Sequence, residues 1–224
     1  GVVVHGEHHL GADPVSGDSR PGWPHGKVVA RGEDCGSRLV WVRLQGRFHD
    51  LIVVGAYIPH WQRVDPTREK VLRALELLVQ RLQQSNVCVI ILGDLNSRLA
   101  RNQPGLTGKF CMHARADEGG KQVLKMMEDL GMSAASTFFC PKKAAKLGSA
   151  TYISNPHRKP AQIDYAIVTR RWGSSVTSSQ VEWRHSLWRF GHGEKFDHGL
   201  LRIFFKFRIR NSRQKTRQSQ KIVW

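Results

Sequence analysis

Three short strings hold the side chains of this chain that are best suited to chemistry. They are Gly93-Asp94-Leu95-Asn96, Gln162-Ile163-Asp164-Tyr165 and Phe196-Asp197-His198-Gly199, and each lies beside an apolar stretch that predicts a buried strand. Together they supply three aspartates, one asparagine and one histidine. Carboxylate and amide oxygens are ligands of hard cations, and an imidazole can transfer a proton near neutral pH. The set predicts a site that holds a hard cation beside a phosphate and activates water.

Each string alone also has a simpler interpretation. Asp94 and Asn96 project to the same side of an extended chain, but Asp and Asn also favour turns at strand ends. Asp164 is costly to bury in its apolar strand unless an Arg, a His or a metal is its partner, and a structural ion pair would be enough. A buried Asp164 could also hold the imidazole of His198 in the orientation needed to donate to a phosphoryl group.

Two further patterns complete the candidate chemistry. Tyr57-Ile58-Pro59-His60 ends a predicted strand, so a Tyr hydroxyl and a His could contact a phosphate at its rim. The four cysteines form no C-x-x-C pair, which argues against a zinc site. Low cysteine usage is typical of a reducing compartment.

The charge of the chain favours a polyanionic substrate. The formal net charge is +17, and residues 200–224 contain eight Lys or Arg and no acid. This basic segment is either a solvated tail or a surface that contacts a phosphate backbone. Membrane-surface binding is less favoured, because the tail is no amphipathic helix with a large apolar face. The sequence has no run of eighteen apolar residues, which argues against a membrane span.

The elements that must position these side chains can be predicted from hydrophobic periodicity. The pattern predicts strands at 1–4, 27–30, 38–44, 50–57, 87–92, 150–154, 161–169 and 200–207. It predicts one helix from Asp65 and Pro66, an N-cap and a first helical residue, to about Ser85. A second helix is predicted at 119–130, with Gly131 as its stop. Strands mixed with helices, without a clear boundary, predict one α/β or α+β domain.

The order of the motifs resembles the endonuclease/exonuclease/phosphatase superfamily. That family has an Asn, a Glu, Y-x-P, G-D-x-N, I-D-Y and S-D-H, and the last four stand here at 57–59, 93–96, 163–165 and 196–198. The finer resemblance is to the endonuclease domains of non-LTR (LINE-type) retrotransposons. It rests on the glycine loop, E-x-G, helix and T-F-F end within 105–139, and on Thr151-Tyr152 and Gln162 to Tyr165. The resemblance covers residues 1–207 and leaves 208–224 as a basic tail or linker.

The resemblance implies a fold and a reaction. The fold would be α/β, a four-layer sandwich of two packed mixed β-sheets flanked by helices. The reaction would be phosphodiester hydrolysis, most simply DNA nicking, with Mg²⁺ or Mn²⁺. Asp94 would orient or deprotonate the attacking water and, with Asp197, hold the metal. Asn96 would steady the water and the phosphate, and His198, held by Asp164, would stabilise charge in the transition state.

The same resemblance implies substrate contacts and partners. Tyr57 would contact the phosphate, and the residues on the substrate side would be His60, Trp61, Arg98 and Arg101. The expected partner is DNA, with a reverse transcriptase domain downstream in the parent polypeptide and no membrane. We expect an intracellular monomer, with the nucleus as a compatible compartment.

Two departures from the family pattern leave alternatives open. The family's Asn and metal-binding Glu belong upstream of strand 1–4, so the chain looks like a fragment, and neither Glu7 nor Glu33 stands in the right context. Phe196 replaces the usual Ser before Asp-His. The alternatives are a catalytically inactive nucleic-acid-binding remnant, or a superfamily phosphatase that acts on inositol phosphate or phospholipid.

Overall fold

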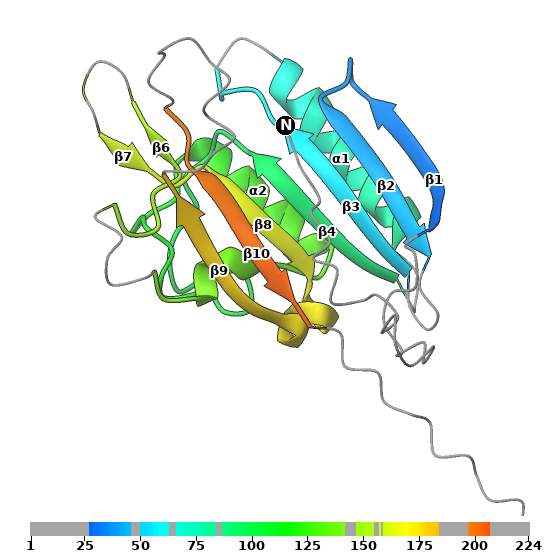
Figure 1. Ribbon diagram of the computed structural model, residues 1–224. Helices are drawn as coiled ribbons and strands as arrows, with labels where there is room; N and C mark the ends of the chain where they lie inside the picture. Colours follow the sequence, from blue (N-terminus) through cyan, green and yellow to red (C-terminus); the bar gives the residue numbers. More distant parts are fainter. Residues whose placement is uncertain are drawn as a thin grey trace, which may run out of the picture.

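The computed structural model describes residues 27–45, 50–62, 66–83, 87–141, 147–154, 157, 159–183 and 197–206. Its centre is a six-stranded mixed sheet with the order β1-β2-β3-β4-β8-β5 (Figure 1). The strands are β1 Lys27–Asp34, β2 Leu39–Gln45, β3 Asp50–Tyr57, β4 Val87–Asp94, β8 Asp164–Thr169 and β5 Met132–Ala134. β3 and β4 pair in parallel, and the other pairs of this sheet are antiparallel.

Two helices, α1 Thr67–Leu82 and α2 Glu118–Asp129, cover one face of this sheet (Figure 1). Apolar residues at helical spacing bury one side of each helix against alternate residues of the strands, and these side chains form the main core. Asp117 is the N-cap residue of α2, and its carboxylate accepts a hydrogen bond from the backbone N–H of Gly120. It ends before Gly131, whose φ of 61° is the left-handed conformation that favours glycine.

A two-stranded antiparallel ribbon, β9 Val176–Glu182 and β10 Leu200–Phe205, covers the opposite face (Figure 1). Its side chains Ile203 and Phe205 pack on a second, smaller core that includes Cys88, Ile90 and Val168. The described residues therefore form three layers: helices, mixed sheet and ribbon. The short strands β6 Tyr152–Ile153 and β7 Pro160–Ala161 pair separately, and the 3₁₀ helices are η1 Ala135–Phe138 and η2 Arg170–Ser175.

The predicted α/β class is confirmed, and the layering is simpler than predicted. In the part of the chain that the structure describes, the second sheet is the β9–β10 ribbon, and no helix covers its outer side. The helix predicted from Pro66 begins one residue later, because Pro66 is its N-cap residue. The predicted strand 161–169 is two strands, interrupted at Gln162-Ile163. The predicted strand 1–4, residues 84–85 and the tail 208–224 lie outside the described ranges.

The sequence patterns did not predict β5 and β9. β5 has three residues, and β9 has the polar sequence VTSSQVE, so neither shows the apolar periodicity that marks a strand. In the described ranges, no helix has the length and apolar character needed to cross a membrane.

Candidate functional site

Polar side chains lie in one row across the end of the mixed sheet. Tyr57 is in register with Asp94 on the neighbouring strand, and Asp94 is in register with Asp164. Residues in register on adjacent strands project from the same face. That face also carries the second core, so the apolar residues of β4 and β8 fix which way the two carboxylates point. The sheet thus brings two motifs that are seventy residues apart in the sequence into direct opposition.

Gly93 makes the close approach of β3 and β4 possible at this point. A Cβ at residue 93 would lie 1.8 Å from the carbonyl oxygen of Ala56, far inside any real contact distance. Its φ of 159° is a further obstacle to a larger residue. Glycine before Asp94 therefore keeps the carboxylate in register with Tyr57.

The Asp94–Asn96 segment forms a tight Asx turn at the end of β4. The Asn96 backbone N–H donates to Asp94 Oδ1 at 2.8 Å, and its amide Nδ2 donates to Asp94 Oδ2 at 3.1 Å. Nδ2 also donates to the carbonyl of Ile58 at 3.1 Å. Asn96 adopts φ 45°, which Asn tolerates better than most residues. The turn interpretation of this string is therefore confirmed, and the turn orients the Asp94 carboxylate, whose part in chemistry stays a prediction.

Asp164 pairs with His198, the partner that the sequence favoured. His198 Nδ1 lies 3.1 Å from Asp164 Oδ2. The buried Thr151 hydroxyl accepts hydrogen bonds from the backbone N–H groups of Ile163 and Asp164, and the Thr151 carbonyl accepts one from Gly199. Thr151 therefore holds both partners of the pair in place.

Asp94, Asp164 and His198 form a group that could hold a metal ion. One ligand atom from each lies within 4.8 Å of the others. Two carboxylates fit a hard divalent cation. His198 Nδ1 is engaged by Asp164, so the carboxylates are the better ligands. The donor set fits Mg²⁺ or Mn²⁺ more closely than zinc, which prefers nitrogen and sulfur.

The electrostatics of the group follow from burial and crowding. Burial raises the pKa of Asp94 to about 6, and the negative charge of Asp164 adds to the rise. The hydrogen bond to Asp164 raises the pKa of His198, although burial opposes this effect. Two carboxylates facing each other favour a bound cation, because it would remove their mutual repulsion.

The other predicted site residues lie around this group. Asp197 precedes His198, and its carboxylate is exposed and outside the group, although its charge acts on Asp94. Tyr57 is 50% exposed at the rim. The remaining predicted residues do not contact the group through any described hydrogen bond: they are exposed His60, whose Nδ1 lies 2.9 Å from the Trp61 carbonyl, half-buried Trp61, and exposed Arg98 and Arg101.

Arg38 was not predicted from the sequence, and it extends the polar row by one strand. Leu39 is in register with Ala56, and the Tyr57 N–H donates to the Arg38 carbonyl at 2.8 Å, so Arg38 lies beside Tyr57. Its Nε atom is buried and has no hydrogen-bond partner among the described residues. One signal could have found it: Arg38 directly precedes β2, whose residues are mostly apolar.

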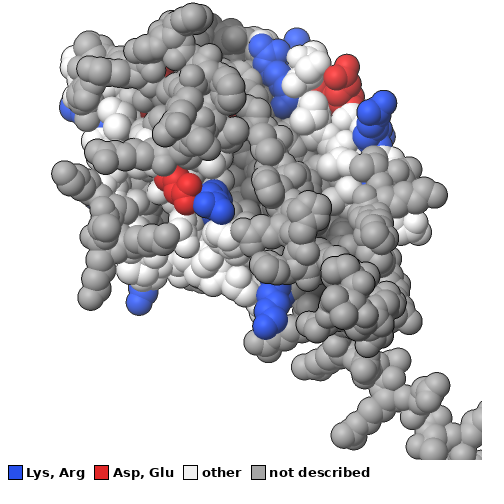
Figure 2. Space-filling view, in the orientation of Figure 1, with Lys and Arg blue, Asp and Glu red and all other residues white. Residues whose placement is uncertain are grey.

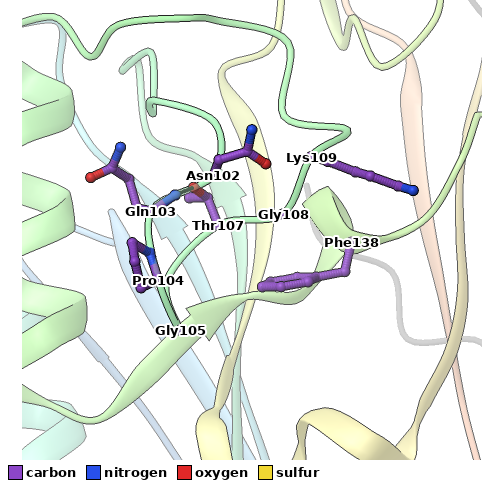
Figure 3. A pocket seen from close by; sticks show the side chains of 8 residues that line it. All are labelled: Asn102, Gln103, Pro104, Gly105, Thr107, Gly108, Lys109 and Phe138. Carbon is purple, nitrogen blue, oxygen red and sulfur yellow. Dashed lines mark hydrogen bonds between the residues drawn. The ribbon is translucent and has the colours of Figure 1, made fainter.

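A shallow groove of about 420 Å³ lies apart from this group, in the loop after Asn96. Residues 102–105, 107–109 and Phe138 line it, and their side chains do not converge on one point (Figure 3). The lining contains no carboxylate or imidazole. The loop is tied to β8 because the Tyr165 hydroxyl accepts a hydrogen bond from the Leu99 N–H and donates to the Gln162 carbonyl. The groove therefore belongs to the surroundings of the site and not to its chemistry.

Comparisons with known proteins place this architecture. No family model matches the chain. Craniofacial development protein 2 of Bos taurus is 28% identical over 174 residues, which are 77% of this chain and 27% of that protein. The chain thus spans about a quarter of the curated relatives that it matches.

Solved structures are similar at the level of the fold. The 3′ phosphatase NExo from Neisseria, bound to a product DNA hairpin, has a TM-score of 0.52 at 14% identity, over 76% of this chain and 65% of that one. An AP endonuclease from Archaeoglobus fulgidus has a TM-score of 0.51 at 15% identity, over 76% of this chain and 66% of that one. An endonuclease/exonuclease/phosphatase family protein from Leptotrichia buccalis has a TM-score of 0.51 at 14% identity, over 81% of this chain and 62% of that one. The chain therefore has the endonuclease/exonuclease/phosphatase fold.

Proposed function

We propose that this chain binds DNA and hydrolyses a phosphodiester bond with Mg²⁺ or Mn²⁺, leaving a nick. The observation that carries the proposal is the group of Asp94, Asp164 and His198 at one end of the mixed sheet. Two structural neighbours, a 3′ phosphatase seen with product DNA and an AP endonuclease, support it.

The geometry suggests a role for each side chain. Asp94 and Asp164 would hold the cation, which supplies a positive charge beside the phosphate and lowers the pKa of bound water. Both amide hydrogens of Asn96 are engaged, so its Oδ1 is left to accept a hydrogen bond from the attacking water. His198 Nδ1 is held by Asp164, so Nε2 would present a proton to the phosphoryl oxygen.

The charge around the site suits a nucleic-acid backbone. Residues 98–115, which follow Asn96, contain four Lys or Arg and no Asp or Glu. On the face seen in Figure 2, the basic side chains of the described residues stand apart and do not gather in one patch. The net charge of +17 favours contacts along an extended polyanion. It disfavours the alternative of a small headgroup such as an inositol phosphate.

The finer proposal is an endonuclease of the retrotransposon type. It rests on the strings at 105–139, 151–152 and 162–165. Two further expectations belong to this finer proposal. They are an intracellular location, with the nucleus as a compatible compartment, and a downstream reverse transcriptase domain.

Nicking of supercoiled plasmid tests the proposed function. We expect conversion to the open circle with Mg²⁺ or Mn²⁺ and none in EDTA, because the two carboxylates need the cation. The control is Asp94→Asn, purified in parallel. Equal nicking by both proteins would point to a contaminant, and no nicking by either would refute hydrolysis by this chain.

Arg38→Gln is expected to weaken DNA binding about tenfold and to leave kcat little changed. The guanidinium stands two strands from Asp94, about 10 Å away, where it can contact a neighbouring phosphate. Binding is measured by fluorescence anisotropy with a short duplex in Ca²⁺. The matched control is Arg73→Gln, because the Arg73 side chain lies on the exposed side of helix α1. An equal loss in both variants would assign the effect to net charge alone.

One observation favours a second candidate, DNA binding without hydrolysis. Within the described ranges no Glu joins the metal-binding group, and Glu33 is exposed and accepts a hydrogen bond from Ser37. Salt-dependent DNA binding without nicking in the same assay would support this candidate.

A further inference from the structure

Arg68 is buried beneath the site although it carries a charge. Its exposed fraction is 1%, and it lies on the apolar stripe of α1 with Val71 and Leu75. A guanidinium has five N–H donors, and five acceptors surround this one. They are the carbonyls of Pro59, Leu95 and Gly119, the Ser97 hydroxyl and the Gln122 Oε1. Every donor has a partner.

The acceptors come from the segments that build the site. Pro59 belongs to the turn after Tyr57, and its carbonyl accepts from Nη1 at 2.6 Å. Leu95 and Ser97 flank Asn96, and Gly119 lies in the first turn of α2. The guanidinium therefore joins the ends of β3 and β4 to the start of α2.

A second observation shows that space is reserved for this guanidinium. A Cβ at Gly119 would lie 2.9 Å from Arg68 Nη2 and 3.1 Å from the Ser97 hydroxyl oxygen. The lack of a side chain at Gly119 thus leaves room for the guanidinium, although alanine has the higher helix propensity at such a position.

Packing alone does not explain a cation at this position. None of the five acceptors is a carboxylate, so no direct ion pair offsets the cost of burying the charge. An apolar side chain would fill the same stripe without this cost, but it would leave the five acceptors without the guanidinium donors.

We propose that Arg68 is the positioning residue of the site, which fixes the Tyr57–Pro59 turn against the Asp94–Ser97 turn. The carboxylate of Asp94 and the amide of Asn96 then keep one arrangement. The catalytic consequence rests on the proposed function, whereas the structural consequence does not.

Arg68→Lys tests the proposal because it keeps the charge and supplies three donors in place of five. Hydrogen–deuterium exchange is expected to rise in peptides that cover residues 57–61 and 94–99 and to stay unchanged in β1 and β2. In the nicking assay, kcat is expected to fall about tenfold or more while KM stays within about twofold. Gly119→Ala, which crowds the guanidinium, should give the same local pattern if the lysine variant does not fold.

The control is Arg43→Lys, at the far end of β2, where Arg43 pairs with Asp50 at 2.6 Å. It should leave exchange near residues 94–99 and kcat unchanged. Exchange that rises uniformly, or that does not change, would overturn the proposal. If the unmodified chain does not nick DNA, the proposed function fails, and the exchange pattern still decides the positioning role.

Discussion

Replacing Asp94 with Asn is expected to lower nicking by about 10³-fold or more. The substitution keeps the shape of the side chain, and its amide oxygen can still accept from the Asn96 backbone N–H, so the Asx turn can persist, whereas the bond from Asn96 Nδ2 is lost. It removes one of the two carboxylates that would hold the cation and the group that would orient the water. The measurement is the single-turnover rate of plasmid nicking as a function of Mg²⁺ concentration.

The same substitution is expected to stabilise the metal-free protein at pH 8. The folded pKa of Asp94 is raised from 3.8 to about 6, so its ionisation disfavours folding above pH 6. The destabilisation is absent below pH 4, grows between pH 4 and 6, and is complete above. Two pKa units correspond to at most about 3 kcal/mol, and we expect about 1 to 3 kcal/mol. Mg²⁺ should stabilise the native chain and not the variant.

Asp129→Asn is the matched control, because Asp129 is exposed at the end of α2 and pairs with Lys125. It should change neither nicking nor the response of the melting temperature to Mg²⁺. An Asp94→Asn variant that melts at the same temperature as the native chain at pH 8 in EDTA would contradict the electrostatic account of the site.

Replacing His198 with Gln is expected to lower kcat by about 10² to 10⁴ and to change the shape of the pH profile. In the native chain, activity should rise as Asp94 loses its proton and fall as His198 loses its own at higher pH. The variant should lack the alkaline fall. Its acid limb should move to higher pH, because the positive charge of His198 lowers the pKa of Asp94. Rates measured from pH 5 to 10 test both changes.

The stability of this variant has the opposite pH dependence to that of Asp94→Asn. The folded pKa of His198 is raised, so its pair with Asp164 stabilises the fold below the unfolded pKa near 6.5. This stabilisation is lost as the pH rises through the folded pKa. The variant should therefore be less stable at pH 5, and the difference should shrink at alkaline pH. His157→Gln, at an exposed turn, is the control.

The sequence predicted the elements whose patterns are local. Strand 50–57 was predicted with its observed ends. The strand predicted at 87–92 begins where predicted and continues to Asp94 in the structure. Helix α2 was predicted to within a residue, because its apolar periodicity and Gly131 both lie in the chain itself. Asp94, Asp164 and His198 of the motif strings gather in the structure, whereas Asp197 lies outside their group. Register explains why Asp94 meets Asp164.

The sequence did not predict features that depend on partners far along the chain. β9 is polar and is a strand because β10 pairs with it. Arg68 appears as an ordinary helical Arg until it is aligned with the apolar stripe of α1, and its five acceptors come from three other segments. The partnerless Nε of Arg38 likewise becomes visible only when its neighbours are in place.

The three members of the metal-binding group come from distant parts of the chain. Asp94 ends β4, Asp164 begins β8, and His198 follows Asp94 by 104 positions. A cation held by Asp94 and Asp164 would close a loop of seventy residues, in the way that a disulfide cross-links an unfolded chain, and Asp164 would in turn hold His198 just before β10. The bound state would then hold the β9–β10 ribbon against the sheet, and loss of the cation would loosen the last elements of the fold first.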